Sequence, residues 1–236
     1  SSLLYEISDD DYNFSSSVNI INDLTKNNSD KYEYIIPNYQ FNKETSLNNS
    51  IFDNLNFSSS GNFRKYNTNV DEADMVNDFV FSSVNQKQSS NLESEFKLLF
   101  RNVNTYGDLS NTYKENEDYK ILGSTLLNLE YPLFKDRKNS KSFLTPMASL
   151  RYSPNNGLNL KEENKIINFE DLFSLDRIDN KSVEAGDSIT LGVEYKKLLN
   201  TNEEKSKFGI AMNFRRNKDE DIPLSTSLGE KTSDLI

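Results

Sequence analysis

The sequence predicts an all-β, antiparallel protein of roughly ten to twelve strands, and three observations carry this prediction. Apolar and polar residues alternate with a period of two over successive stretches of about 9 to 14 residues. Turn-forming residues separate these stretches, and short polar connections alternate with longer charged ones. No helical period and no repeat of about 20 to 50 residues is visible. Strands of this length, joined in this way, are typical of an up-and-down transmembrane β-barrel, although a soluble β-sandwich also shows a period of two.

The composition excludes a helical membrane protein but permits a transmembrane β-barrel. Only 35% of the residues are apolar, the mean hydropathy is −0.73 and the formal net charge is −10. No stretch approaches the roughly 18 consecutive apolar residues of a membrane-spanning helix. A barrel is still permitted because its strands expose only every second residue to lipid and its lumen is polar. The acidic balance, with scattered Lys and Arg, argues against nucleic acid as a partner.

The residue types that are missing exclude several kinds of active site. The chain contains no His, no Cys and no Trp, which excludes Ser-His-Asp and Cys-His catalytic groups, Cys/His zinc sites and disulfides. We therefore expect no enzyme, no cofactor and no bound metal. Four acidic clusters could offer oxygen ligands to Ca²⁺ or Mg²⁺, but none has EF-hand spacing, and solvated turns are the expected explanation. They lie at residues 9–11, 71–74, 115–118 and 219–221.

The predicted strands follow one another along the whole chain. They cover residues 3–8, 12–24, 31–41, the two halves of 51–66, 75–84, 92–105, 121–131, 143–152, 187–195 and 207–216. Pro37 lies inside one of these patterns, which requires a sheet edge, a bulge or a strand end at that point. The run Ser58-Ser59-Ser60-Gly61 predicts a turn that divides 51–66 into a strand pair. For residues 218–236 we expect either a poorly ordered tail or a further strand cut short.

The last three predicted strands show the alternation most clearly. Their apolar faces hold Leu144, Pro146, Ala148, Leu150, Tyr152, Ile189, Leu191, Val193, Tyr195, Phe208, Ile210, Met212 and Phe214. The opposite faces carry small or polar residues, so we expect these faces to contact water. Four polar residues on these faces are the candidates for lining a hydrophilic lumen, and in a soluble sheet they would face solvent. These candidates are Arg151, Glu194, Asn213 and Arg215.

A compact acidic and apolar segment, residues 169–178, lies between two of these strands. Its candidate structural residues are Asp171, Phe173, Asp176 and Arg177. One interpretation is a loop that folds into the mouth of a barrel, with Arg177 paired to one of three nearby carboxylates. Those carboxylates are Asp176, Asp179 and Glu184. The alternative is an ordinary surface loop, whose apolar residues pack only against one another; they are Leu172, Phe173, Leu175 and Ile178.

Tyrosines lie mostly near the ends of predicted strands. They are Tyr12, Tyr32, Tyr34, Tyr39, Tyr66, Tyr131, Tyr152 and Tyr195. Rings with polar tips are favoured at a membrane interface, where one end is apolar and the other is wet. Tyrosine is also simply a good strand residue, so this pattern fits both a membrane girdle and a soluble sheet.

Several of these stretches, in this order, resemble the lipopolysaccharide-assembly outer-membrane protein family (LptD, formerly organic solvent tolerance protein). The matching blocks are Asp30-Lys31-Tyr32-Glu33-Tyr34-Ile35-Ile36-Pro37, as in alphaproteobacterial members, then Leu144-Thr145-Pro146, Leu150-Arg151-Tyr152-Ser153-Pro154, Asp171-Leu172-Phe173-Ser174-Leu175-Asp176-Arg177, Val183-Glu184-Ala185-Gly186 and Leu191-Gly192-Val193. The chain departs from the family where Leu175 and Asp176 precede Arg177, since Asn is more usual there. It also has Asp179-Asn180-Lys181-Ser182 in place of the family's Gly-Asp-Arg.

The resemblance implies a C-terminal portion of a barrel in the cell outer membrane. Such a barrel receives lipopolysaccharide from a periplasmic bridge and releases it through a lateral opening into the outer leaflet, without making or breaking a bond. The implied partners are lipopolysaccharide, membrane lipid, the bridge components and a plug lipoprotein (LptE-like). Because about ten strands cannot close the family's larger barrel, we expect residues 1–236 to form one domain that is part of it.

Two alternatives remain open at this point. A soluble, secreted β-sandwich that binds a partner would pack four apolar residues inside, against a second sheet, whereas a barrel would place them outside. These residues are Leu191, Val193, Phe208 and Ile210. A general porin-like barrel would instead show a constriction of charged side chains within a closed ring.

Overall fold

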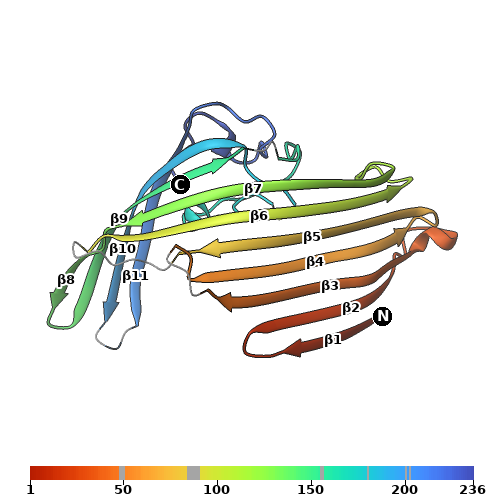
Figure 1. The fold of residues 1–236 in the computed structure, drawn as a ribbon, viewed down its shortest axis with the longest axis horizontal. Coiled ribbons are helices and arrows are strands. Elements are labelled where there is room, and N and C mark those ends of the chain that lie inside the picture. The colour runs from red at the N-terminus through yellow and green to blue at the C-terminus, as the bar shows by residue number, and fades with distance from the viewer. Residues whose placement is uncertain (48–50, 84–90, 155–156, 180, 200, 202) are drawn as a thin grey trace. The chain divides into compact units, whose positions relative to one another are not determined.

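The computed structural model describes residues 1–236 except 48–50, 84–90, 155–156, 180, 200 and 202. The described strands form one 11-stranded antiparallel sheet in the order β1-β2-β3-β4-β5-β6-β7-β9-β10-β11, with β8 paired to β9 (Figure 1). The predicted all-β, antiparallel class is therefore confirmed. Strand order follows chain order, as expected when successive strands are joined as hairpins. Within the described part of the chain, β1 and β11 stand at the two ends of this order.

The strands are β1 (Ser2–Ser8), β2 (Tyr12–Asn22), β3 (Tyr32–Ser46), β4 (Asn54–Tyr66), β5 (Val70–Ser82), β6 (Glu93–Asp108), β7 (Asn116–Glu130), β8 (Leu133–Arg137), β9 (Ser140–Ser153), β10 (Gly186–Leu199) and β11 (Glu204–Arg215). Three short 3-10 helices lie in the connections: η1 (Asn28–Lys31), η2 (Asp171–Phe173) and η3 (Ser227–Gly229). A helix that is long and apolar enough to cross a membrane is not found among the described residues.

The predicted turn at Ser58-Ser59-Ser60-Gly61 is wrong, because these residues lie inside β4. They pair in continuous register with residues 39–42 of β3. Gly61 is needed there for close packing: a Cβ atom would come within 2.4 Å of the Asp74 carbonyl oxygen on β5. Pairing on both sides therefore overrides the local turn preference. Pro37, by contrast, lies at a register shift between Ile35 and Asn38, so of the three alternatives that the sequence left open the structure shows the bulge.

The chain divides into two compact units, and each is described by itself. Unit 1 comprises Ser1–Phe81 and Phe100–Leu122, and unit 2 comprises Ser82–Leu99 and Gly123–Ile236. The sequence predicts a single domain of 1–236, and the strand order given above runs through both units. Strand β8 was not expected from the sequence, and it forms a short hairpin with the start of β9 in unit 2.

In unit 1, one face of the sheet carries a row of aromatic rings. Phe41 lies 6.3 Å from Tyr12 and 5.9 Å from Phe57, and Phe57 lies 4.8 Å from Phe79, measured between ring centroids. The row therefore crosses β2, β3, β4 and β5. Offset or tilted rings at these separations attract one another beyond the area that they bury, so the row ties neighbouring strands together.

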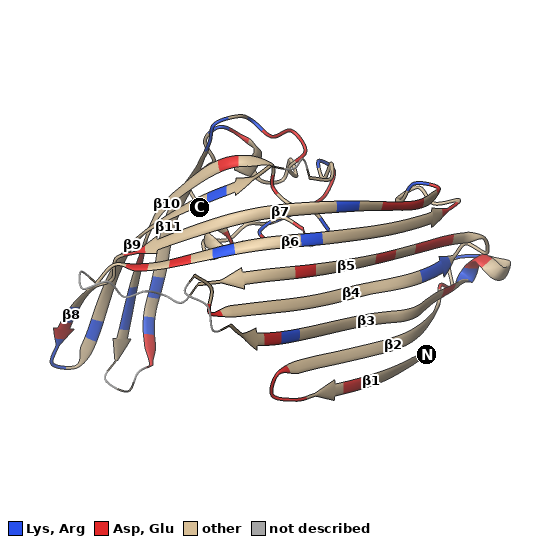
Figure 2. Cartoon of the chain, in the orientation of Figure 1, with Lys and Arg blue, Asp and Glu red and all other residues tan. Residues whose placement is uncertain are grey.

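The opposite face of unit 1 is polar, and its charged side chains pair across strands. Acidic residues recur along β5 (Figure 2), and Glu72, Asp74 and Asp78 lie on this face. The Arg101 guanidinium donates two hydrogen bonds to the Asp78 carboxylate, at 2.8 and 2.7 Å. The Glu72 carboxylate accepts hydrogen bonds from the Tyr66 and Ser110 hydroxyls, at 2.9 and 2.6 Å. The charged groups of Arg101, Asp78 and Glu72 are thus paired within the sheet and its connections.

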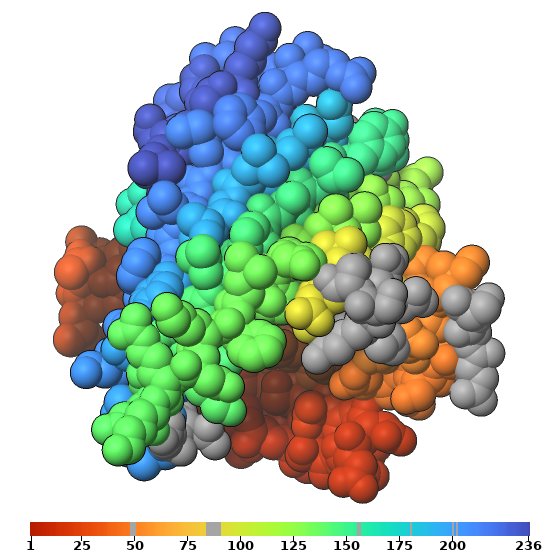
Figure 3. Space-filling model, turned by 90° about the vertical axis from the view of Figure 1, so that its left-hand side faces the viewer, coloured from red at the N-terminus to blue at the C-terminus, as the bar shows by residue number. Residues whose placement is uncertain are grey.

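In unit 2, strands β9, β10 and β11 follow the predicted alternation in their register. Ile189 pairs with Leu150 and with Phe214, and Leu191 pairs with Ala148 and with Met212. This apolar face is exposed: Leu191 is 50%, Ile210 48% and Phe208 63% exposed. Figure 3 shows the three strands side by side at the surface, from green (β9) through cyan (β10) to blue (β11). The burial of these residues that a sandwich requires is not observed.

Candidate functional site

Two segments of unit 2 cover the polar face of β9, β10 and β11. We call residues 157–185 the loop segment and residues 216–236 the tail segment. They supply most of an apolar core, whose buried members are Ile167, Leu172, Phe173, Ile178, Ala211, Ile222 and Leu228. Leu172 and Leu228 are fully buried. The sheet contributes Ala211, with Met147 packed at the border. The loop segment therefore packs on the sheet and is not an ordinary surface loop.

Two glycines on the polar face make room for aromatic rings of the loop segment. A Cβ atom at Gly192 would lie 2.9 Å from the Phe173 ring, and one at Gly209 would lie 2.7 Å from the Phe169 ring. Those separations are too short for real side chains, so the rings lie directly on the strand backbone. The Phe169 and Phe173 rings also contact each other, with centroids 5.4 Å apart. The two rings and the two glycines fix the position of the loop segment.

A buried charge cluster joins the loop segment to the strands. The Arg177 guanidinium donates to both carboxylate oxygens of Glu184, at 2.6 Å each. It also donates to Ser188 and Asn213 side-chain oxygens, at 3.2 and 3.0 Å. Of the three carboxylates that the sequence offers to Arg177, Glu184 forms this bidentate pair. Arg177 is 2% and Glu184 5% exposed, so the pair is strong in geometry and is costly to break.

Two further arginines surround Glu184. Arg215 of β11 donates to the Glu184 carboxylate and to the Ala185 carbonyl oxygen. Arg151 of β9 donates to the Ser174 and Leu175 carbonyl oxygens, and its Nε lies 3.9 Å from the Glu184 carboxylate. One buried carboxylate thus faces three guanidinium groups. Arg215 also reaches the Asp219 carboxylate of the tail segment, at 3.3 Å.

The pKa of Glu184 follows from this arrangement. Burial alone would raise the pKa of its carboxyl, but the charges of Arg177, Arg151 and Arg215 and the hydrogen bonds from Arg177 lower it to about 2. Glu184 is therefore ionised throughout the neutral and mildly acidic range. Its negative charge is a fixed component of the cluster and holds the three arginines beneath the loop segment.

The candidate lumen residues are placed in two different ways. Arg151, Asn213 and Arg215 are buried, at 5%, 0% and 7% exposure, because the loop and tail segments cover them. Glu194 is half-buried and lies 3.2 Å from the ammonium of Lys207. The expectation that this face is wet is thus wrong at the three buried positions. The chain's own segments, which a strand pattern cannot reveal, cover these three residues and bond to part of their polar groups.

Two of the four candidate loop residues are buried, one is half-buried and one is exposed. Phe173 and Arg177 are buried, and the Phe173 carbonyl oxygen accepts a hydrogen bond from the Asn128 amide of β7 at 3.0 Å. Asp171 is half-buried and closes a reciprocal turn with Asn168, with hydrogen bonds of 3.0 and 2.9 Å. Asp176 is exposed. The structure therefore brings Phe173 and Arg177 to the strands, while Asp171 shapes the loop segment itself.

A small cavity lies beside the charge cluster. Its volume is about 10 Å³, and Ser124, Arg151 and Glu184 are among the residues that line it. The Ser124 hydroxyl oxygen and the Arg151 Nε are buried without a hydrogen-bond partner within the described residues. A volume of this order admits at most about one water molecule. Across the described residues, no group of three or more acidic side chains could hold a metal ion.

Three features of the site were not predicted from the sequence. They are the packing of aromatic rings on Gly192 and Gly209, the role of the tail segment, and the hydrogen bond from Asn128. The glycines could have been found, because Gly192 and Gly209 are the positions without a side chain on otherwise polar strand faces. The tail segment runs beside β11, with backbone hydrogen bonds between Ala211 and Ile236 in both directions, at 2.8 and 3.0 Å. The composition of 218–236 left open poor order or a truncated strand, and it gives no sign of this pairing.

Comparisons with known proteins add no relative. Neither a protein-family model nor a curated protein matches the chain. The case for a function therefore rests on the residues and on their arrangement.

Proposed function

We propose that the chain is a portion of an outer-membrane β-barrel that transports lipopolysaccharide and inserts it into the outer leaflet. One observation carries this proposal: on β9, β10 and β11 the apolar face is exposed and the polar face is buried. Leu191 is 50% exposed, whereas its neighbour Thr190 is 2% exposed. A soluble sheet shows the opposite arrangement, since it buries its apolar face.

The exposed apolar face has a natural environment in lipid. Its exposed members in unit 2 are Leu144, Leu150, Tyr152, Ile189, Leu191, Phe208, Ile210 and Phe214. They are adjacent in the register of three paired strands, so they form a continuous patch. Such a patch is unfavourable in water but favourable against acyl chains. Strands of 12 to 14 residues are also long enough to cross a bilayer when tilted.

The resemblance to the lipopolysaccharide-assembly family supports the same proposal through one of its blocks in unit 2. That block, residues 171–177, with the following 183–186, coincides with the buried part of the loop segment, including Arg177 and Glu184. In a barrel, a segment fixed on the polar face narrows the lumen. The remaining polar space would pass the sugar portion of the glycolipid while its acyl chains stay in apolar surroundings. No covalent step is needed, so the work is translocation and the protein is not an enzyme.

The aromatic row of unit 1 fits this environment as well. Phe41, Phe57 and Phe79 place apolar rings side by side across three strands. An apolar surface of this kind is favourable against acyl chains. The proposed location is the cell outer membrane. The proposed partners are lipopolysaccharide, membrane lipid, a plug lipoprotein and periplasmic bridge components, which follow from the family resemblance.

The first test is whether β-structure requires lipid or detergent. Circular dichroism of residues 1–236 should show a folded β-sheet in micelles or vesicles and not in plain buffer. A monomer that unfolds cooperatively in plain buffer would exclude the membrane barrel and leave the soluble binding module.

A second test asks which face meets the lipid. The chain has no tryptophan, so Leu191→Trp and Leu224→Trp each introduce a single reporter, on the apolar face and on the exposed tail segment respectively. Brominated lipids should quench the first reporter strongly and the second little. Equal quenching would contradict the proposed orientation. Steady ion conductance through planar bilayers would instead favour a porin-like barrel.

A further inference from the structure

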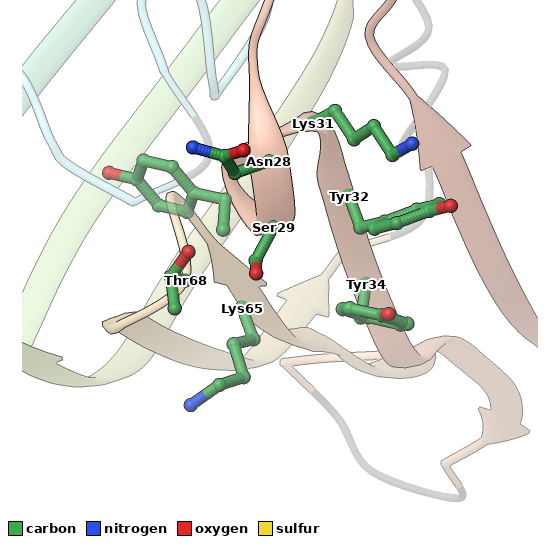
Figure 4. Close-up of a pocket in the computed structure, with 8 residues that line it drawn as sticks. Asn28, Ser29, Lys31, Tyr32, Tyr34, Lys65 and Thr68 are labelled. Atoms are coloured by element: carbon green, nitrogen blue, oxygen red, sulfur yellow. The ribbon is translucent and has the colours of Figure 1, made fainter.

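An open pocket of about 590 Å³ lies in unit 1, where η1 leads into β3 (Figure 4). Its lining residues are Asn28, Ser29, Lys31, Tyr32, Tyr34, Lys65, Tyr66 and Thr68. The volume is within the range of small-molecule sites. The charged residues of this lining are Lys31 and Lys65, so the wall of the pocket is cationic. Hydroxyl and amide groups from the other residues provide further hydrogen-bonding atoms.

The two lysines differ in whether their ammonium group is already paired with a carboxylate. The Lys65 ammonium is fixed by the Asp71 carboxylate, at 2.9 and 3.1 Å. The Lys31 ammonium lies 4.9 Å from the Tyr32 ring centroid, and within the described residues it has no carboxylate partner. A cation placed over a ring, without a neutralising acid, is available to an anionic ligand. The pocket therefore favours negative charge next to Lys31.

The tyrosines offer a flat surface beside this charge. The Tyr32 and Tyr34 rings lie next to each other on β3, with centroids 6.4 Å apart and planes inclined by 35°. They are 37% and 38% exposed, so much of their surface is free. Aromatic faces of this kind pack against the apolar faces of sugar rings, while the phenol hydroxyls bond to polar groups. Charge and rings together favour a phosphorylated sugar over a bare anion.

The register places one wall of the pocket on the apolar side of the sheet. Tyr34 is the pairing partner of Lys65, and because side chains alternate along β4, Lys65 shares its face with Phe63, which is 37% exposed. Tyr66, which also lines the pocket, lies on the opposite face. The pocket thus lies at the strand ends, and its Tyr34 and Lys65 wall continues into exposed apolar residues. In a membrane this is the level at which headgroups meet acyl chains.

We propose that this pocket binds the phosphorylated sugar headgroup of a glycolipid. Lys31 contacts the phosphate, the Tyr32 and Tyr34 rings contact the sugar, and the acyl chains extend along the apolar face. The assignment rests on the proposed function, since it requires this face to lie in lipid. It names a contact that the transported or surrounding glycolipid makes outside the polar face.

The experiment uses the whole chain folded in detergent, with Tyr34→Trp as the single fluorescent reporter. Four probes are titrated: lipid A in mixed micelles, soluble glucosamine 1-phosphate, neutral glucosamine and inorganic phosphate. Lipid A and glucosamine 1-phosphate should both change the fluorescence saturably, because they share the sugar phosphate. A response to lipid A alone would place the recognition in the acyl chains, and equal affinity for glucosamine or inorganic phosphate would show that charge and sugar are not read together. Any of these three results overturns the proposal.

Variants at the lysines separate this site from general attraction to basic residues. Lys31→Met should weaken binding of glucosamine 1-phosphate about tenfold, and Lys31→Arg should restore most of it. Lys26→Met is the matched control, because Lys26 is close in sequence, bonds to Asn67 at 2.8 Å and does not line the pocket. Equal losses in Lys31→Met and Lys26→Met would overturn the assignment.

The two proposals can fail separately. Sheet formation that requires lipid, together with no response to glucosamine 1-phosphate, removes the pocket and leaves the membrane barrel in place. Cooperative folding in plain buffer removes the membrane barrel and, with it, the glycolipid as occupant of the pocket, even where soluble sugar phosphate still binds.

Discussion

The polar side chains on one face of the sheet find their partners in different ways in unit 1 and in unit 2. In unit 1 the charges pair strand to strand, as in Arg101 with Asp78. In unit 2 the loop and tail segments cover the face, and Arg177 reaches the strands from outside the sheet. Cross-strand pairs hold a sheet together but leave its face accessible. A covering segment removes the face from solvent, and its stability then depends on a few buried contacts.

The largest expected effect comes from removing the one carboxylate that is buried among the described residues of unit 2. Glu184→Gln takes the counter-charge from Arg177 and Arg151 and leaves Arg215 with the Asp219 carboxylate at 3.3 Å, so it should destabilise the unit by about 3–5 kcal/mol. Urea unfolding in micelles measures this cost. The matched variant in unit 1 is Glu72→Gln, since Glu72 is equally buried, at 5% exposure, but accepts hydroxyl hydrogen bonds and lies 3.7 Å from one guanidinium group, that of the partly exposed Arg64. A smaller cost for Glu184→Gln than for Glu72→Gln would contradict the difference drawn between the units.

Acid should release unit 2 through the same residue. Because the pKa of Glu184 is lowered from 4.5 to about 2 in the folded protein, its contribution of about 3 kcal/mol is present above pH 4.5 and is lost as the pH falls toward 2. Hydrogen exchange of residues 171–185, corrected for its intrinsic pH dependence, should accelerate over this interval. Unchanged protection down to pH 2 would show that the carboxylate does not hold the loop segment.

An intermediate effect is expected from adding a side chain at a glycine on which an aromatic ring packs. Gly209→Ala places a methyl group against the Phe169 ring and should cost about 1–3 kcal/mol by displacing that ring. Trypsin should then cleave faster at Lys161 and Lys165 of the loop segment. Adding Phe169→Ala to Gly209→Ala removes the clash, so the second change should cost less than it does alone. Strictly additive costs would show that the ring and the glycine do not interact.

The smallest effects should come from exposed ion pairs, and they should be alike in both units. Lys207→Met breaks contacts with Glu170 and Glu194 in unit 2, and Lys65→Met breaks the pair with Asp71 in unit 1. All of these groups are at least partly exposed, so each change should cost less than about 1 kcal/mol. If Lys207→Met lowered the free energy of unfolding by several kcal/mol, the stability of the loop segment would depend on these exposed ion pairs as well as on the buried charge cluster.

The sequence predicted local features well and tertiary ones poorly. The two faces of β10 and β11 could be assigned because a period of two depends only on neighbours in the chain. The turn predicted at Ser58-Ser59-Ser60-Gly61 failed because pairing with β3 and the close approach of β5 outweigh turn preference. The interruption predicted at Pro37 was found, because proline has no backbone N–H to donate to a neighbouring strand.

The candidate site shows the same limit. Sequence spacing left three carboxylates as partners for Arg177, and only the packing of the loop segment on β10 and β11 selects Glu184. Burial of Arg151 and Asn213 could not be predicted, because it depends on segments that show no strand pattern. Tyr32 and Tyr34 were noted as strand-end tyrosines and as part of the block of residues 30–37, but neither observation predicts a pocket, since the sequence does not reveal a neighbouring lysine from another strand.

The two end strands of the described sheet differ in how much backbone they leave open to other chains. The tail segment runs along β11 and bonds to Ala211, Asn213 and Arg215, so those positions cannot template a foreign strand. Strand β1 is exposed along its whole length and carries Leu3, Leu4 and Tyr5 at 71%, 60% and 59% exposure. Bare, apolar edges of this kind nucleate aggregation. When the chain is produced alone, we expect precipitation to begin at β1, and Leu4→Lys should raise the soluble yield more than the same change at Leu224 of the tail segment.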